Sequence, residues 1–296
     1  ARRRHNVRSM PTSRDGPRRR ANFAAVSAQR VALLPTCVVD TVSPEVGEAV
    51  VRVLRRLECD VVVPEAATCC GQPAWNAGFS HDAAQVAART LNALIDELDQ
   101  HPGTIICVPA GSCAAMIRVF WPELFHLASD HDAVERARRV GSHTREFSEL
   151  VHERSGGTMT GVYPAEVAYH HSCHMLRELR IKDAPEEVLG GLDRCHLNSW
   201  SAAERCCGFG GLFSVKLPET SVAMADDKLS SLAENDITHL VGSDQSCLLH
   251  LRGRLRRQTG ETRDTGVPGP PITVKHLAQV LDEAGARPRA SGAAEE

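Results

Sequence analysis

The sequence has few aromatic residues, little net charge and no long apolar run. Aromatic residues make up 4% of the 296 positions, which argues against a base-stacking platform for single-stranded nucleic acid. The formal net charge of −3 gives no electrostatic reason to expect a nucleic-acid or anionic-membrane partner. No stretch approaches the ~20 apolar residues of a membrane-spanning helix. With 42% hydrophobic and 24% charged residues, the composition is that of a globular protein.

The two ends of the chain also lack the pattern of a folded or targeting segment. The basic opening stretch is not followed by the roughly 7–15 apolar residues of an export signal. We therefore expect residues 1–28 to form a disordered leader and residues 285–296 to form a disordered tail. The expected location is the cytoplasm.

A nucleotide-binding fingerprint is missing as well. The glycine-rich stretch "GFGG" at 208–211 lacks the G-x-G-x-x-G spacing and the strand–turn–helix context of a dinucleotide site. The sequence therefore predicts no nicotinamide or flavin site of that type.

Cysteine, by contrast, is abundant and unevenly placed. The chain has 11 cysteines, an odd number, and a reducing compartment disfavours disulfides. Grouped cysteines in such a protein indicate metal binding or catalysis. Two groups contain adjacent cysteines followed by glycine, "TCCGQPA" at 68–74 and "RCCGFGG" at 205–211.

Eight of the cysteines repeat one pattern: a single cysteine, a doublet and another single cysteine. The first set is Cys37, Cys69, Cys70 and Cys113, and the second set is Cys173, Cys206, Cys207 and Cys247. From the first single cysteine to the doublet is 32 positions in one set and 33 in the other. This spacing indicates an internal duplication, which defines the domain plan.

Short apolar strands alternate with helical patterns in both repeats. Strands are expected at "RVALLP", "DVVVP" and "TIICVP" in the first repeat and at "AEVAYH", "CHLNSW" and "THLVG" in the second. Ser43-Pro44-Glu45 predicts a helix start with a capping hydroxyl. The alternation predicts an α/β fold of two similar domains, residues 29–155 and 160–284, each a parallel sheet flanked by helices.

Every cysteine of the two sets follows a predicted strand, where parallel sheets place their functional groups. Thiolates favour iron–sulfur clusters or zinc over hard cations. Adjacent cysteines converge on one small ion only with strain, whereas a polynuclear cluster offers each of them a different iron. We therefore expect each set to hold an iron–sulfur cluster in its own pocket, with zinc in one half as the alternative.

Several neighbours of the cysteines are expected to shape the site. Gly71 and Gly208 let the backbone turn after each doublet, and Gly210 and Gly211 extend this around the second doublet. Phe209 is expected to line the pocket, and His174 is expected to lie beside the metal cluster. Cys59, Cys107 and Cys195 have no counterparts in the repeat and are interpreted as buried hydrophobic residues.

Several longer stretches carry a family resemblance. They include "TCCGQPAWNAG", "PAGSCAAMI", "YHHSCHMLREL" and "CCGFGGLFSVKLPETSVAMADDKL". Over about residues 30–283 the chain resembles lactate utilization protein A. This family belongs to the CCG-domain group, which also includes the iron–sulfur subunit of glycolate oxidase and a cysteine-rich subunit of heterodisulfide reductase. The resemblance implies a cytoplasmic iron–sulfur subunit that oxidises L-lactate to pyruvate together with two partner proteins, one of ferredoxin type. It also implies [4Fe-4S] binding through the eight repeated cysteines.

The sequence departs from the heterodisulfide reductase pattern at one position in each half. Those relatives carry a fifth cysteine where this chain has Ala110 and Asp244. A non-cubane cluster and disulfide chemistry are therefore less expected, and Asp244 or His174 stays open as a non-cysteine ligand. Three hypotheses follow: an electron-transfer subunit, a cluster-dependent thiol or disulfide reductase, and a zinc-binding scaffold without catalysis.

Overall fold

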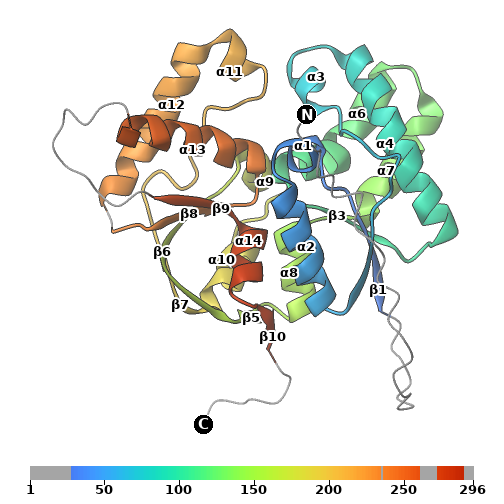
Figure 1. The fold of residues 1–296 in the computed structure, drawn as a ribbon. Coiled ribbons are helices and arrows are strands. Elements are labelled where there is room, and N and C mark those ends of the chain that lie inside the picture. Colours follow the sequence, from blue (N-terminus) through green and yellow to red (C-terminus); the bar gives the residue numbers. More distant parts are fainter. Residues whose placement is uncertain (1–27, 235, 261–271, 290–296) are drawn as a thin grey trace, which may run out of the picture.

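The computed structural model describes residues 28–234, 236–260 and 272–289. Most of the predicted leader, and residues 290–296 of the predicted tail, lie outside these ranges. Two four-stranded parallel sheets lie side by side, each with helices on both faces (Figure 1). The α/β architecture with a repeated parallel sheet, predicted from the sequence, is confirmed.

The first half runs from β1 to α8. Its strands are β1 (Gln29–Leu33), β2 (Cys59–Val62), β3 (Ile105–Val108) and β4 (Thr144–Glu146). Its helices are α1 (Cys37–Val42), α2 (Pro44–Arg56), α3 (Gln72–Asn76), α4 (Ser80–Gln100), α5 (Gly111–Ala115), α6 (Trp121–Leu127), α7 (His131–His143) and α8 (Phe147–Ser155). A π-helical turn, η2 (Met116–Phe120), joins α5 to α6.

The second half repeats this plan. Its strands are β5 (Met159–Thr160), β6 (Val162–His170), β7 (Asp193–Asn198), β8 (His239–Gly242), β9 (Thr273–His276) and β10 (Arg287–Pro288). Its helices are α9 (Cys173–Arg177), α10 (Asp183–Gly190), α11 (Phe213–Lys216), α12 (Pro218–Ser230), the 3-10 turn η3 (Ser231–Glu234), α13 (Gln245–Gly260) and α14 (Leu277–Glu283).

The two sheets have the same strand order. It is β2-β1-β3-β4 in the first half and β7-β6-β8-β9 in the second, with every pair parallel. The inner strands β1 and β6 are therefore equivalent, as are β3 and β8. Parallel strands end at one edge of a sheet, so the loops that follow them gather there.

Alternating residues of the inner strands enter different cores because both faces of each sheet are covered. In β1, Val31 and Leu33 belong to one buried cluster, while Ala32 belongs to another. The outer face of the first sheet packs against α4, α6 and α7, and the outer face of the second packs against α12 and α13.

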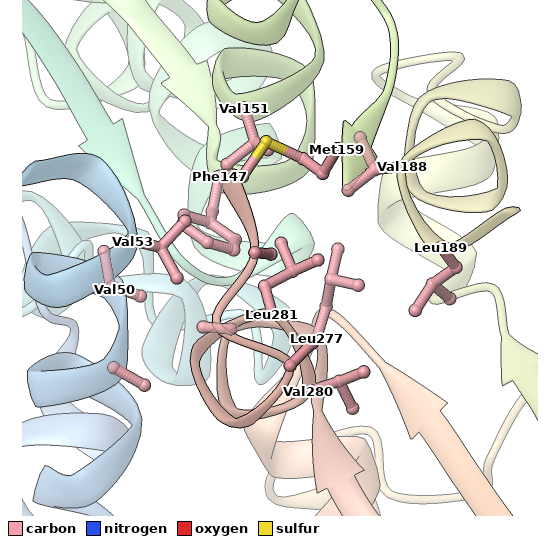
Figure 2. Packing of buried hydrophobic residues seen from close by; sticks show 14 of the residues in the cluster. Val50, Val53, Phe147, Val151, Met159, Val188, Leu189, Leu277, Val280 and Leu281 are labelled. Carbon is pink, nitrogen blue, oxygen red and sulfur yellow. The ribbon is translucent and has the colours of Figure 1, made fainter. Parts of the chain in front are cut away.

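The inner faces of the two sheets share one hydrophobic core. Val50 and Val53 of α2 belong to the same buried cluster as Leu277 and Leu281 of α14 (Figure 2). Helices α8 and α10 also line this region between the sheets (Figure 1). Apolar burial of roughly 25 cal/mol per Å² makes such a continuous interface strongly stabilising. The halves are thus joined by packing as well as by the chain.

Three local features differ from the sequence-based expectations. Strand β4 was not predicted, because its three residues, "TRE", carry two charged side chains. Ser43 does not cap α2 through its side chain; its hydroxyl accepts a hydrogen bond from Gln245 Nε2 of the second half at 2.8 Å. Arg287–Pro288, in the predicted tail, pairs antiparallel with β5. Within the described ranges, no helix is both long and apolar enough to cross a bilayer.

Candidate metal centre

The first four repeated cysteines, here called the first quartet, follow the ends of three neighbouring strands. Cys37 opens α1 after β1, and Cys113 lies in α5 after β3. Cys69 and Cys70 lie in the loop between β2 and α3. The strand order β2-β1-β3 places these three loops side by side at the carboxyl edge of the sheet.

The sulfur atoms of the first quartet interact with one another. Cys70 Sγ and Cys113 Sγ are 3.2 Å apart. The Cys37 thiol, and then the Cys70 thiol, hydrogen-bond to Cys69 and lower its pKa to about 3. The Gly71 N–H also donates to Cys69 Sγ, at 3.5 Å. The same contacts raise the pKa of Cys37 and Cys70, so the quartet favours negative charge on Cys69, in the thiolate form that binds metal.

The second quartet, Cys173, Cys206, Cys207 and Cys247, has the same arrangement. Cys173 opens α9 after β6, the doublet lies between β7 and α11, and Cys247 lies in α13 after β8. Cys207 Sγ and Cys247 Sγ are 3.0 Å apart. Hydrogen bonds from Cys173, and then Cys207, lower the pKa of Cys206 to about 2.

Backbone N–H groups after the second doublet also point at sulfur. Gly208 N–H donates to Cys206 Sγ and Phe209 N–H donates to Cys207 Sγ, both at 3.4 Å. Such N–H donors stabilise thiolates and the sulfurs of a cluster. In the first quartet, the Gly71 N–H contact to Cys69 is joined by backbone hydrogen bonds from Cys70 to Cys69 and from Val38 to Cys37.

The glycine after each doublet is required for two reasons. Gly71 and Gly208 have φ of +85° and +83°, a region that glycine enters without penalty. A Cβ at Gly71 would lie 2.6 Å from the Ala83 carbonyl oxygen, and one at Gly208 would lie 2.5 Å from the Ser221 carbonyl oxygen. The glycines therefore let the first doublet loop pack directly on α4 and the second directly on α12.

Both quartets border a single cavity of about 110 Å³. The sequence predicted a separate pocket for each quartet, but the two sheet edges face each other across this space. Its lining includes seven of the eight repeated cysteines, together with His174, Phe209, Gly210 and Gly211. Cys69 is the eighth cysteine, and it hydrogen-bonds to Cys37 and Cys70.

Asp244 connects the two halves at the cavity wall. Its Oδ2 accepts a hydrogen bond from the Ser112 N–H of the first half at 2.9 Å, and its Oδ1 accepts one from Ser246 Oγ at 2.6 Å. Ala110 and Asp244, the two positions that carry a fifth cysteine in heterodisulfide reductase, form an antiparallel β-bridge with each other. Asp244 thus links the second half to the first through its side chain and its backbone.

The three histidines around Cys173 have different surroundings. His174 lines the cavity and packs edge-on against Phe120 with ring centroids 6.3 Å apart. His171 Nε2 is bonded to Glu186 at 2.7 Å, outside the cavity. His170, which was not predicted as a site residue, is fully buried at the end of β6. Burial, and then the charge of Lys228, hold its pKa well below the usual value, so the ring is neutral.

Lys228 is a second functional candidate that was not predicted. It is fully buried in α12, and its Nζ donates to the carbonyl oxygens of Ala202, Ala203 and Arg205 in the loop before the second doublet. Its ammonium also lies 4.4 Å from the Trp200 ring centroid. Burial lowers its pKa to about 8, while the nearby cysteines of the second quartet oppose this shift.

The remaining cysteines fit their interpretation as hydrophobic residues. Cys59, Cys107 and Cys195 are buried in the core shared by the two halves, away from the cavity lining. All 11 cysteines are free thiols.

The donor set fits an iron–sulfur centre. Each half supplies four sulfur donors and N–H groups aimed at sulfur. Thiolate sulfur is the preferred ligand of iron–sulfur clusters and also suits zinc. When bound, a cluster would supply one-electron redox chemistry.

Comparison with known proteins agrees with this geometry. A family model described as a cysteine-rich domain, CCG, matches residues 31–118 and 167–252. Over 254 residues, the chain is 39% identical to lactate utilization protein A of Exiguobacterium sp. strain AT1b, covering 86% of this chain and 97% of that protein. The proteins of the same name from Geobacillus kaustophilus and Bacillus pumilus are 37% and 36% identical, with 86% of this chain and 98% and 99% of theirs covered. The chain therefore belongs to the lactate utilization protein A family and carries the CCG cysteine-rich domain twice.

Proposed function

We propose that the protein is an iron–sulfur electron-transfer subunit of a complex that oxidises L-lactate to pyruvate. The observation that carries the proposal is the meeting of two thiol quartets at one cavity. The relatives named lactate utilization protein A support the pathway. In this role the chain acts in the cytoplasm with two partner subunits, one of them a ferredoxin-type protein.

The residues of the chain would have distinct parts in this function. The eight cysteines would hold two [4Fe-4S] clusters, one per quartet. The N–H groups of Gly71, Gly208 and Phe209 would stabilise the sulfur charge. Gly210, Gly211, Phe209 and His174 would line the space between the centres. Lactate would lose its hydride in a partner, because this chain carries no G-x-G-x-x-G fingerprint.

The reductase hypothesis has less support. Ala110 and Asp244 stand where a fifth cysteine would be needed, so neither quartet has a fifth sulfur donor at that position. These two residues instead form a β-bridge between the halves. A zinc site remains the second candidate, because His170, Cys207 and Cys247 form a compact group of donors. Metal identity separates these functions.

The test begins with anaerobic purification and analysis of iron and acid-labile sulfide. We expect both in the wild-type chain, with about half of each lost in Cys70→Ser and in Cys207→Ser. The iron-loaded protein is then mixed under argon with the two partner subunits and L-lactate, and we expect bleaching of the visible absorption. D-lactate is the control. Zinc in place of iron, or no bleaching with L-lactate, would refute the proposal.

A further inference from the structure

His170 has an environment that its burial alone does not explain. The side chain is 0% exposed, and neither ring nitrogen has a hydrogen-bond partner of normal geometry within the described structure. The backbone of Ala203 makes a weaker contact with the ring. A buried polar group without a partner costs about 1–3 kcal/mol, so such groups are rare and generally have a reason. A ligand that binds the ring would supply that reason.

Two sulfur atoms of the second quartet lie next to this ring. A ring nitrogen of His170 and the Sγ atoms of Cys207 and Cys247 all lie within 4.8 Å of one another. The three residues come from separate elements: the end of β6, the doublet loop and α13. Three buried donors from three elements form a built site, and imidazole with thiolate is a common metal-ligand combination.

The first half has no equivalent donor. Cys37 and Cys173 are matching residues, so Leu34 occupies the position of His170. Leu34 is apolar and 1% exposed. Across the described residues, the group around His170 is the one set in which three histidine, cysteine or acidic donor atoms all lie within 4.8 Å of one another. The two repeats therefore share the four cysteines but differ at the position three residues before the first of them, which is Leu34 in one half and His170 in the other.

We propose that His170 is a nitrogen ligand of the metal centre in the second half, so that the two halves hold unequal centres. The inference rests on the proposed function and deepens it. The first centre would have four cysteine ligands. In the second centre His170 would take the place of one of the four cysteines, so that its ligands include His170, Cys207 and Cys247 and not all eight repeated cysteines bind a cluster. Neutral imidazole in place of an anionic thiolate raises the reduction potential of an iron–sulfur centre. The second centre is then the electron acceptor of the pair.

The experiment isolates one centre at a time in the full chain. Cys70→Ser with Cys113→Ser leaves the second centre, and Cys207→Ser with Cys247→Ser leaves the first. Each protein is reconstituted with iron and sulfide, reduced, and examined by pulsed electron paramagnetic resonance. We expect the strong ¹⁴N coupling of a directly bound imidazole in the second centre and none in the first.

Two further variants identify the nitrogen. His170→Leu, which copies Leu34, should remove the coupling and lower the midpoint potential of the second centre. His174→Gln, which changes the histidine that lines the cavity, should leave the coupling in place. A second centre without strong coupling before any histidine is changed would overturn the proposal, whether or not His170→Leu folds. Coupling that survives in His170→Leu would also overturn it.

A cobalt titration separates this inference from the proposed function. If the wild-type chain binds no iron, the electron-transfer proposal fails, and Co²⁺ added to the metal-free protein then tests His170 by itself. The visible d–d bands should show a mixed nitrogen–sulfur site that becomes sulfur-only in His170→Leu. Identical spectra for the two proteins would refute a ligand role.

Discussion

Thr90 of α4 and Lys228 of α12 occupy the same place in the two halves. Each lies seven residues after the residue whose carbonyl contacts the doublet glycine, Ala83 in one half and Ser221 in the other. The Thr90 hydroxyl donates to the Cys69 carbonyl and accepts from the Thr68 N–H, both at 2.9 Å. Lys228 holds the second doublet loop with an ammonium group instead. One quartet is therefore supported by a neutral group and the other by a cation.

Replacing Lys228 with methionine should affect both stability and redox behaviour. The carbonyl oxygens of Ala202, Ala203 and Arg205 would lose their donor, and we expect a loss of about 2 kcal/mol in the free energy of unfolding. Loss of a nearby positive charge should also lower the midpoint potential of the second centre. Urea denaturation and a redox titration measure the two effects. Thr90→Val is the matched control: it should cost about 1 kcal/mol and leave that potential unchanged. An unaltered potential in Lys228→Met would contradict the electrostatic role.

Alanine at Gly71 should damage the first quartet through steric contact. A positive φ costs an alanine about 1 kcal/mol relative to glycine, and overpacking against the Ala83 carbonyl adds about 1–3 kcal/mol. Gly78→Ala is a close control, since Gly78 has φ of +86° but open space around its Cα. We expect Gly71→Ala to be less stable than Gly78→Ala and to bind less iron. Thermal denaturation and iron analysis compare them, and equal stability would rule out the steric explanation.

Asparagine at Asp244 should weaken the link between the halves without removing metal. Both carboxylate oxygens already accept hydrogen bonds, from Ser112 and Ser246, and an amide can accept through one oxygen alone. We expect a loss of about 1–2 kcal/mol in stability and an unchanged iron content per chain. A fall in iron would show instead that Asp244 is a ligand.

Glu146 should make stability depend on pH. Burial raises the pKa of this carboxyl to about 8, although hydrogen bonds from the Ser148 hydroxyl and N–H oppose the shift. Glu149, Cys107 and Tyr169 are the titratable groups near it. Because the folded pKa is above the unfolded value of 4.5, its stabilising contribution is complete below pH 4.5 and is lost as the pH rises to about 8.

The Glu146→Gln variant tests this dependence. Between pH 5 and pH 8, the free energy of unfolding of the variant should rise relative to that of the wild type by a few kcal/mol, on the order expected for the pKa shift. Urea denaturation across that range measures the difference. Glu153→Gln is the control, because Glu153 lies in the helix that Glu146 caps and has 45% of its side chain exposed. Parallel pH curves for wild type and Glu146→Gln would show that Glu146 ionises normally.

Much of the fold was predictable because local signals agreed with it. The cysteine spacing indicated the duplication, and β3 is a continuous apolar run followed by Pro109 and Gly111. The short strand β4 was missed because its pairing with β3 defines it, and its own residues do not. Ser43 precedes α2 as predicted, but its hydroxyl does not cap the helix, because it bonds to Gln245, 202 positions away in the chain.

The site was predictable up to the point where tertiary contacts decide. The cysteine doublets and the glycines after them could be recognised because these residues are consecutive in the sequence. His170 and Lys228 gave no such signal: one histidine of three in "YHHSCH" and a lysine in a helical stretch are ordinary until burial is known. That the quartets face one cavity depends on how two sheets pack, which spacing along the chain does not encode.

The core that α2 and α14 share has a consequence for a broken chain. The connector from α8 to β5, residues 156–158, contains Gly156, which is exposed and has a positive φ. A protease cut there would sever the peptide between the repeats but remove none of the apolar contacts of Val50, Val53, Leu277 and Leu281. The two fragments should stay associated and co-elute as a nicked dimer of unlike pieces, with the cavity between them intact.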